Sequence, residues 1–227
     1  MRVWGTGTVG FWSLNPTACQ VEIMTEQEPQ RIPTRKKNTQ YRSREYLTLA
    51  EVNKIIKAAG ERGRHKERDR TLLSMMFRHG LRASEVCQLK WDAVMLEENT
   101  IWINRVKGSE SGFHPVPPDE KEALIELQKL YPGCIYVFAN ERGQCLSVDA
   151  IAKIVERSTK AAGVPIKVHP HQFRHACGYH LASQGATTRD IQAYLGHKNI
   201  QHTVRYTAQN PKRFENFRWD AGTEPPF

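Results

Sequence analysis

Apolar residues recur at helical spacing through most of the chain after residue 45. A capping-box pattern, Thr48 with Glu51 three residues later, precedes the first such stretch. Glycines such as Gly80 and Gly196 follow other stretches, where a left-handed cap ends a helix. The pattern predicts helices over residues 48–60, 72–79, 85–89, 118–130 and 147–162 and within 169–207, and a highly charged loop over 61–70.

Strand-like alternation is confined to one short stretch of the chain. Ile101, Ile103 and Arg105 alternate with the side chains between them, and two glycines bracket a turn before a second strand at about residues 113–116. This pattern predicts an antiparallel hairpin. The expected fold class is therefore mainly α with a small antiparallel β-sheet, in one domain that spans residues 46–217.

The ends of the chain are expected to lie outside that domain. Residues 1–30 show no usable periodicity, and Met24 is a plausible natural start preceded by a translated leader. We expect residues 1–45 to form a flexible, partly basic extension and residues 218–227 a C-terminal tail. Residues 35–44 contain five basic residues and no acidic one: Arg35, Lys36, Lys37, Arg42 and Arg44. Such a run serves either as an arm that contacts DNA phosphates or as a solvated tail.

Composition favours a polyanionic partner. The 33 lysines and arginines outnumber the 24 acidic residues and give a formal net charge of +9. Charge alone fits a ribosomal or membrane-surface protein equally well. No apolar run approaches the roughly 18 residues of a membrane span, so a cytoplasmic, nucleoid-associated location is expected. The five cysteines form no C-x-x-C pair, and neither a disulfide nor a zinc site is expected.

Residues 169–207 gather the side chains with the clearest chemistry. His171 and Arg174 are three residues apart and share one helical face. His197 is expected to start a new turn after the Gly196 cap, and Tyr206 follows nine residues later, after a further predicted helix. A tyrosine hydroxyl with a pKa near ~10 is protonated at pH 7, and exposing it as phenolate costs on the order of 4 kcal/mol unless a base and cations assist. The set therefore suits an anionic substrate and a phenolic nucleophile.

The spacing of these motifs resembles that of the tyrosine recombinases, also called phage-type integrases. The carboxy-terminal signature is H-x-x-R, then L-G-H with its histidine 23 residues after the arginine, then a tyrosine nine residues further on. Upstream, HGLRASEVCQL at residues 79–89 resembles the first-arginine box of the family, and Lys107 stands where the family keeps its active lysine. The local sequence around these motifs is most similar to that of the fimbrial phase-variation recombinases, which invert a promoter-bearing DNA segment.

The resemblance implies DNA strand transfer through a 3′-phosphotyrosyl intermediate. Tyr206 is expected to attack the scissile phosphate and release a 5′-hydroxyl, which later attacks the partner strand. Arg82 and Arg174 are expected to clamp the nonbridging oxygens and offset the charge of the transition state. Bond energy is kept in the tyrosyl ester, so neither ATP nor a metal ion is expected as a cofactor.

The remaining candidate residues supply proton transfer and support. His171 is expected to act as general base toward Tyr206, and Lys107 to protonate the leaving oxygen. His197 is expected to donate a hydrogen bond to the phosphate. Glu85 is expected to position Arg82 or His171 without contacting the substrate itself. The partners implied are double-stranded DNA at specific, inverted-repeat sites, a tetramer on synapsed DNA, and host DNA-bending proteins.

Other interpretations stay open at this point. A type IB topoisomerase uses the same groups to relax DNA, and a noncatalytic DNA-binding regulator can retain them without turnover. His171 and His175 have the i, i+4 spacing of a metal ligand pair, but the segment offers only Asp190 as a carboxylate and its arginines repel a dication. His175 itself is interpreted as a structural histidine. A lone lysine such as Lys107 is more commonly an edge-strand residue than a catalytic one, and only its register with the other motifs favours catalysis.

Overall fold

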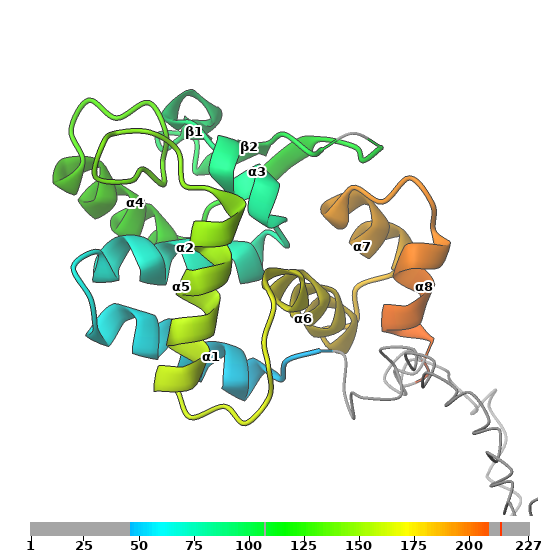
Figure 1. Ribbon diagram of the computed structural model, residues 1–227. Coiled ribbons are helices and arrows are strands. Elements are labelled where there is room, and N and C mark those ends of the chain that lie inside the picture. The colour runs from blue at the N-terminus through cyan, green and yellow to red at the C-terminus, as the bar shows by residue number, and fades with distance from the viewer. Residues whose placement is uncertain (1–45, 107, 209–213, 215–227) are drawn as a thin grey trace, which may run out of the picture. The chain divides into compact units, whose positions relative to one another are not determined.

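Helices dominate the computed structural model, which describes residues 46–106, 108–208 and 214 (Figure 1). In chain order the elements are α1 (Leu49–Glu61), α2 (Lys66–Arg78), α3 (Ala83–Gln88), the 3-10 helix η2 (Trp91–Ala93), β1 (Val94–Met95), β2 (Thr100–Ile103), β3 (Gly112–Pro115), α4 (Pro118–Leu130), α5 (Val148–Ala161), α6 (Pro170–Ser183), α7 (Thr188–Leu195) and α8 (Gln201–Thr207). The predicted fold class, mainly helical with a small antiparallel sheet, is confirmed.

The core lies where α1, α2, α5 and α6 pack together. Thr48 caps α1 as predicted, because its hydroxyl accepts from the backbone N–H of Glu51 at 3.3 Å and the Glu51 carboxylate accepts from the backbone N–H of Thr48 at 2.8 Å. The buried faces of these helices carry Val52, Ile55 and Leu72, each with no exposed surface. Full burial of such a side chain contributes about 1.5–3 kcal/mol.

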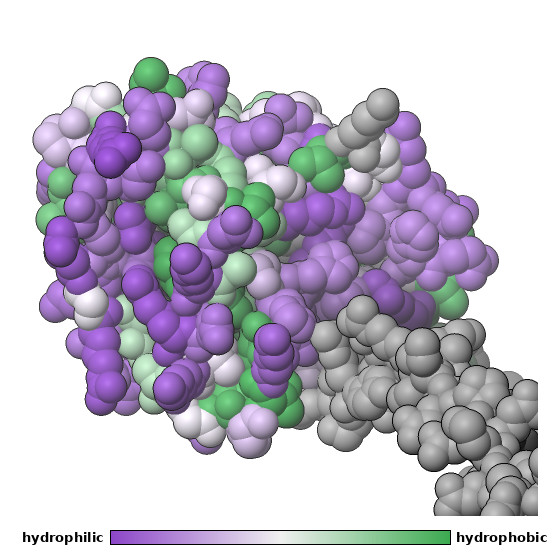
Figure 2. All heavy atoms as spheres, in the orientation of Figure 1, coloured by the Kyte–Doolittle hydropathy of each residue, from purple (hydrophilic) through white to green (hydrophobic). Residues whose placement is uncertain are grey.

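Figure 2 shows that the viewed surface is mostly hydrophilic, with apolar residues in small patches.

The sheet is a meander of three antiparallel strands in the order β1-β2-β3. Ile101 pairs with His114 and Trp102 with Phe113, so the hairpin register sends Ile101 and His114 into the interior and Phe113 outward. The two-residue strand β1 was not predicted. The hairpin extends beyond the sheet toward α7 (Figure 1), where Glu110 N–H donates to the carbonyl of Gly196 at 3.1 Å.

The predicted loop over residues 61–70 is wrong in its second half, because α2 begins at Lys66. Charged residues that suggest an exposed loop are instead paired in the interior. Arg68 and Asp69 are buried, with a 2.8 Å ion pair between them, and Arg68 also donates to the carbonyl of Ala139 at 2.8 Å. Arg157 of α5 completes the pairing of Asp69. These partners lie about 70 to 90 residues away along the chain, so local composition does not reveal them.

Several predictions fall on residues that the structure does not describe. The extension over residues 1–45 with its basic run, Lys107, and the tail over residues 218–227 all lie outside the described residues. Within the described ranges, no helix is long and apolar enough to cross a membrane.

Candidate active site

A buried carboxylate, Glu85 on α3, organises one side of the candidate site. Arg82 immediately precedes α3, and both its backbone N–H and its Nη1 donate to Glu85, at 2.9 and 2.6 Å. Arg105 Nη1 donates to Oε2 of the same carboxylate at 2.9 Å, and Val106 N–H donates to Oε1 at 3.3 Å. Burial alone would raise the pKa of Glu85, but Arg105 and Arg82 outweigh it and lower the pKa below its ordinary value. Glu85 is therefore ionised and bonded to Arg82.

Arg105 is a part of this site that sequence reasoning missed. It is 6% exposed and, besides Glu85, its guanidinium donates to the carbonyls of His79, Gly80 and Tyr194 at 2.9, 3.2 and 2.8 Å. These bonds tie the hairpin to the end of α2 and to α7. The signal was present in the alternation Ile101, Ile103, Arg105, which places the arginine on the inward-facing side of the strand.

Arg174 of α6 approaches the same turn from the opposite side. Its side chain is fully buried at 1% exposure, and its two terminal nitrogens donate to the carbonyls of Gly80 at 2.7 Å and Leu195 at 2.5 Å. Burial, followed by the charges of Arg105 and Arg82, lowers the pKa of Arg174 to about 9, which leaves it protonated at neutral pH. The Gly80 carbonyl thus accepts hydrogen bonds from both Arg105 and Arg174.

Gly80 and Gly196 make the close approach of these segments possible. Gly80 has a φ of +58°, and a Cβ there would stand 2.4 Å from Leu195 Cδ2. Gly196 ends α7 in the predicted left-handed cap with a φ of +69°, and a Cβ there would stand 2.3 Å from the carbonyl oxygen of Glu110 in the hairpin loop. A side chain at either position would separate α7 from the arginine-bearing elements.

His197 follows this cap and is 8% exposed. Its Nδ1 lies 2.9 Å from the hydroxyl of Thr203 on α8, so the turn and α8 fix the ring together. Burial and the nearby Arg174 and Arg82 lower the pKa of His197 to about 3. The imidazole is therefore neutral at physiological pH, and it can offer one N–H donor once Thr203 donates to Nδ1.

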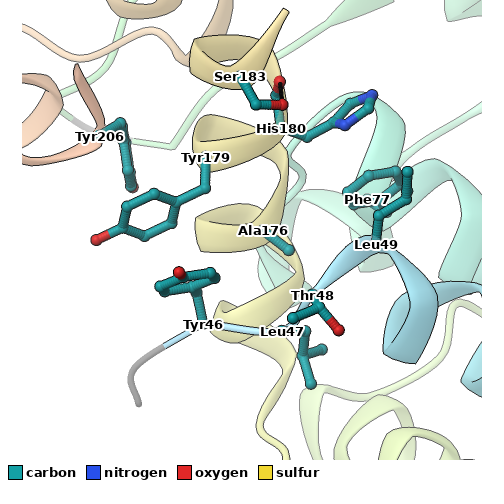
Figure 3. A pocket seen from close by; sticks show the side chains of 10 residues that line it. All are labelled: Tyr46, Leu47, Thr48, Leu49, Phe77, Ala176, Tyr179, His180, Ser183 and Tyr206. Atoms are coloured by element: carbon teal, nitrogen blue, oxygen red, sulfur yellow. Dashed lines mark hydrogen bonds between the residues drawn. The ribbon is translucent and has the colours of Figure 1, made fainter. Parts of the chain in front are cut away.

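Tyr206 of α8 lies against α6 and is only 2% exposed. Its ring packs on Gly178, where a Cβ would come within 2.6 Å of the ring carbon Cε2. The rings of Tyr46 and Tyr179 continue the row along α6 (Figure 3), with ring centroids of Tyr179 and Tyr206 5.1 Å apart. Burial raises the pKa of Tyr206 above its ordinary value, against the opposing effect of Arg205. The resting side chain is thus a protonated phenol in a fixed position.

The hydroxyl of Tyr206 is bonded to a histidine that was not among the predicted site residues. His175 Nδ1 lies 2.9 Å from Tyr206 Oη. His171, the predicted general base, is exposed, and its ring meets the His175 ring edge-on at a centroid distance of 4.4 Å. Partial desolvation and the charges of Arg174 and Arg82 lower the pKa of His171. The i, i+4 spacing placed both histidines on one face but did not say which of them meets the tyrosine.

The arrangement as a whole suits a phosphate and does not suit a metal ion. Arg82, Arg174 and Arg205 all act electrostatically on His171 and His197, and Glu85 is the one acidic group among the main influences on His171. Over the part of the chain that is described, no group of three or more histidine, cysteine or acidic side chains is arranged to hold a metal. Five of the six predicted catalytic residues therefore lie in one cationic neighbourhood, and the sixth, Lys107, is not described.

Comparison with known proteins agrees with this geometry. A family model described as "Phage integrase family" matches residues 45–213. The type 1 fimbriae regulatory proteins FimB and FimE of Escherichia coli K12 are 40% and 41% identical, over 184 and 177 residues; the matches cover 79% and 75% of this chain and 91% and 89% of theirs. A solved structure of XerH site-specific recombinase bound to palindromic difH substrate, a post-cleavage complex, is 25% identical with a TM-score of 0.65. That match covers 75% of this chain and 51% of the XerH chain.

Replacement of Glu85 by glutamine should remove the charge that holds Arg82 and Arg105. Breaking a buried ion pair on one side costs about 3–5 kcal/mol, so Glu85→Gln should lower the free energy of unfolding by about that amount at pH 7. Because folding lowers the pKa of Glu85, its contribution is present above the unfolded pKa of about 4.3 and is lost as the pH falls through the folded value. The difference from the unmodified protein should therefore shrink below about pH 4.3. Urea unfolding at a series of pH values measures the difference in unfolding free energy between the two proteins. The control is Glu98→Gln at an exposed position, which should cost less than about 0.5 kcal/mol. Equal losses in the two variants would contradict the structural role of Glu85.

Proposed function

The chain belongs to the phage integrase family, as a site-specific tyrosine recombinase that breaks and rejoins DNA strands, and on this premise we propose that it inverts a DNA segment with Tyr206 as the nucleophile. The observation that carries the proposal is the placement of the Tyr206 phenol beside the guanidinium groups of Arg174 and Arg205 and beside the neutral His197, on which Arg82 also acts electrostatically. A phosphodiester in this place meets both a nucleophile and the cations that stabilise its transition state.

Arg82 and Arg174 are the proposed clamp on the nonbridging phosphate oxygens. Each fixed donor aimed at developing charge is worth about 10² to 10³ in rate when it is held rigidly in a water-poor site. Rigidity comes from Glu85 for Arg82 and from two backbone carbonyls for Arg174. Arg105 is bonded on all sides to protein groups, so its part is to position Glu85 and the Gly80 turn.

The histidines and the lysine complete the proposed reaction. His197 donates from Nε2 to a nonbridging oxygen, since its Nδ1 faces Thr203. His171, exposed beside Arg174, contacts the phosphate from the surface side. Lys107 protonates the leaving 5′-oxygen; the hairpin loop that carries it is bonded through Glu110 to the turn that carries His197. Cleavage leaves a 3′-phosphotyrosyl bond, and attack by a partner 5′-hydroxyl reverses it.

The relatives support inversion of a fimbrial switch as the biological outcome. FimB and FimE carry the description "type 1 fimbriae regulatory protein" and align with three quarters or more of this chain. The XerH complex is described with a palindromic substrate, which supports inverted-repeat sites on double-stranded DNA for the present chain as well. We further propose a tetramer on two synapsed sites, assistance from host DNA-bending proteins, and phosphate contacts from the basic run at residues 35–44.

Tyr206→Phe removes one oxygen and no positive charge, so it should abolish covalent DNA capture while leaving DNA affinity within about three-fold. The measurement is the yield of protein–DNA adduct on a nicked suicide substrate, beside a binding titration of the same variant. Tyr179→Phe is the matched control. Tyr179 belongs to α6 and its ring lies next to that of Tyr206, so this variant loses a neighbouring hydroxyl and should still capture DNA normally. An adduct that persists in Tyr206→Phe would assign the nucleophile elsewhere.

Inversion separates a recombinase from a topoisomerase or a DNA-binding regulator. The protein should footprint an inverted repeat near its own coding region and, on a plasmid that carries two copies of it, should invert the intervening segment. A plasmid without the repeat should keep its supercoils. Relaxation of that control plasmid would support topoisomerase activity, and footprinting without any adduct would support a regulator.

Lys107→Ala tests the proposed acid. One lysine is a small part of the total positive charge, so DNA affinity should stay within a few-fold, whereas loss of proton donation should slow cleavage by about 10² to 10⁴. A substrate with sulfur in place of the 5′-bridging oxygen has a leaving group that needs no proton and should restore the rate of Lys107→Ala. Arg174→Ala should stay slow on it, because its part is charge stabilisation. Without such rescue Lys107 is a phosphate or edge-strand residue.

A further inference from the structure

We propose that His175, and not His171, is the group that accepts the phenolic proton of Tyr206 when the tyrosine attacks phosphorus. The proposal rests on the proposed function and assigns a further catalytic residue to it. It also explains why two histidines stand one helical turn apart on α6 with only one of them facing the nucleophile.

The hydrogen bonds around His175 determine which ring nitrogen carries the proton. Nδ1 lies 2.9 Å from Tyr206 Oη and 3.2 Å from Arg205 Nη2. A guanidinium can only donate, so a ring nitrogen that faces it must present its lone pair. The proton of the neutral ring is therefore on Nε2. It follows that Tyr206 donates its own hydroxyl proton to Nδ1, which is the direction that general base catalysis requires.

Packing holds the tyrosine in this donor orientation. The Tyr206 ring lies directly on Gly178, three residues after His175 on the same helix, and it meets the Tyr179 ring edge-on at a centroid distance of 5.1 Å. With the ring fixed in this way, rotation of the C–O bond is the main freedom left to the hydroxyl. The acceptor His175 belongs to α6, and the donor Tyr206 of α8 packs against the same helix. No loop therefore has to move to bring the two side chains together.

The surroundings keep His175 unprotonated until substrate arrives. Burial, then His171 on the same helix, Arg205 of α8, Arg174 of α6 and His197 of the preceding turn lower the pKa of His175 to about 3. Tyr206 is the other titratable group in contact with it. A phosphate bound between the arginines offsets their charge, so it raises the proton affinity of His175 at the moment when the base is needed.

The proton balance of both strand-transfer steps closes with this assignment. In cleavage the Oη–P bond forms as the Oη–H bond breaks and its proton passes to His175 Nδ1, while the P–O5′ bond breaks and the 5′-oxygen takes a proton from the acid proposed at Lys107. In rejoining, the partner 5′-hydroxyl attacks phosphorus and gives its proton to that acid. The phenolate leaves and recovers its proton from the imidazolium of His175. Both groups return to their starting states.

Two substitutions of His175 separate proton acceptance from mere positioning. His175→Ala removes the bond to Tyr206, whereas His175→Asn places an amide oxygen near the position of Nδ1 and keeps an acceptor without basicity. Both should retain DNA affinity within a few-fold and form adduct on the suicide substrate about 10² to 10⁴ more slowly. If His175→Ala fails to fold, the asparagine variant carries the test, and adduct formation by it at the normal rate would overturn the proposal.

Chemical rescue gives a readout that a structural role would not produce. Added imidazoles should speed adduct formation by His175→Ala, and among imidazoles of similar size the more basic ones should be more effective. The 5′-bridging sulfur substrate should not rescue His175→Ala, because it replaces the acid and leaves the base missing. His180→Ala is the matched control: this histidine is on the same helix, its ring packs against Phe77, and the variant should react normally.

Other outcomes overturn the proposal in distinguishable ways. An unchanged or faster rate in His175→Ala means that the contact only restrains the tyrosine, and rescue that ignores basicity means that the imidazole only fills space. In either case a Tyr206→Phe variant that forms no adduct would leave the proposed function intact. If Tyr206→Phe still forms adduct, the proposed function itself fails.

Discussion

The buried carboxylate of Glu85 between Arg82 and Arg105 is the interaction on which the site depends. Two guanidinium groups held this close repel each other, and a charge taken out of water costs several kcal/mol unless it is paired. Glu85 solves both problems with hydrogen bonds from Arg82, Arg105 and the backbone of the hairpin. It leaves Arg82 partly exposed and fixed in direction, while Arg105 stays inside and connects α3 to the sheet.

The turn at Gly80 extends this constraint to the rest of the site. Its carbonyl accepts from Arg105 and Arg174, so a single backbone atom relates the position of α6 to that of the hairpin. The lack of side chains at Gly80 and Gly196 brings α7 against both. The residues around the proposed phosphate site come from distant parts of the chain, yet few of them can move independently. This rigidity is what converts hydrogen-bond donors into transition-state stabilisation.

Sequence reasoning succeeded where the cause of a structure is local. The capping box at Thr48 and the left-handed glycine at Gly196 depend on neighbours a few residues away, and the structure contains both. Arg174 and Tyr206 are far apart in the sequence, and it was the motif spacing of the family that indicated their common site. Sequence reasoning failed where the partner is distant. The start of α2 depends on Arg68 reaching the carbonyl of Ala139, and the packing of α6 on α8, which local spacing does not contain, decides that His175 meets Tyr206.

Burial disfavours the charged form of each group in this site, and the resting state depends on how far the ordinary pKa of each group lies from neutrality. The guanidinium of Arg174 stays charged because carbonyl oxygens replace its water, whereas the imidazoles of His175 and His197 lose their protons and the Tyr206 phenol keeps its own. The free protein therefore holds the proposed nucleophile as a neutral phenol beside a neutral imidazole, under excess positive charge. A phosphodiester is a ligand that offsets the excess positive charge, because its negative charge strengthens the neighbouring base and is itself stabilised by the same arginines. Under the proposed function, substrate binding would therefore strengthen the base beside Tyr206 through the same charges that hold the phosphate.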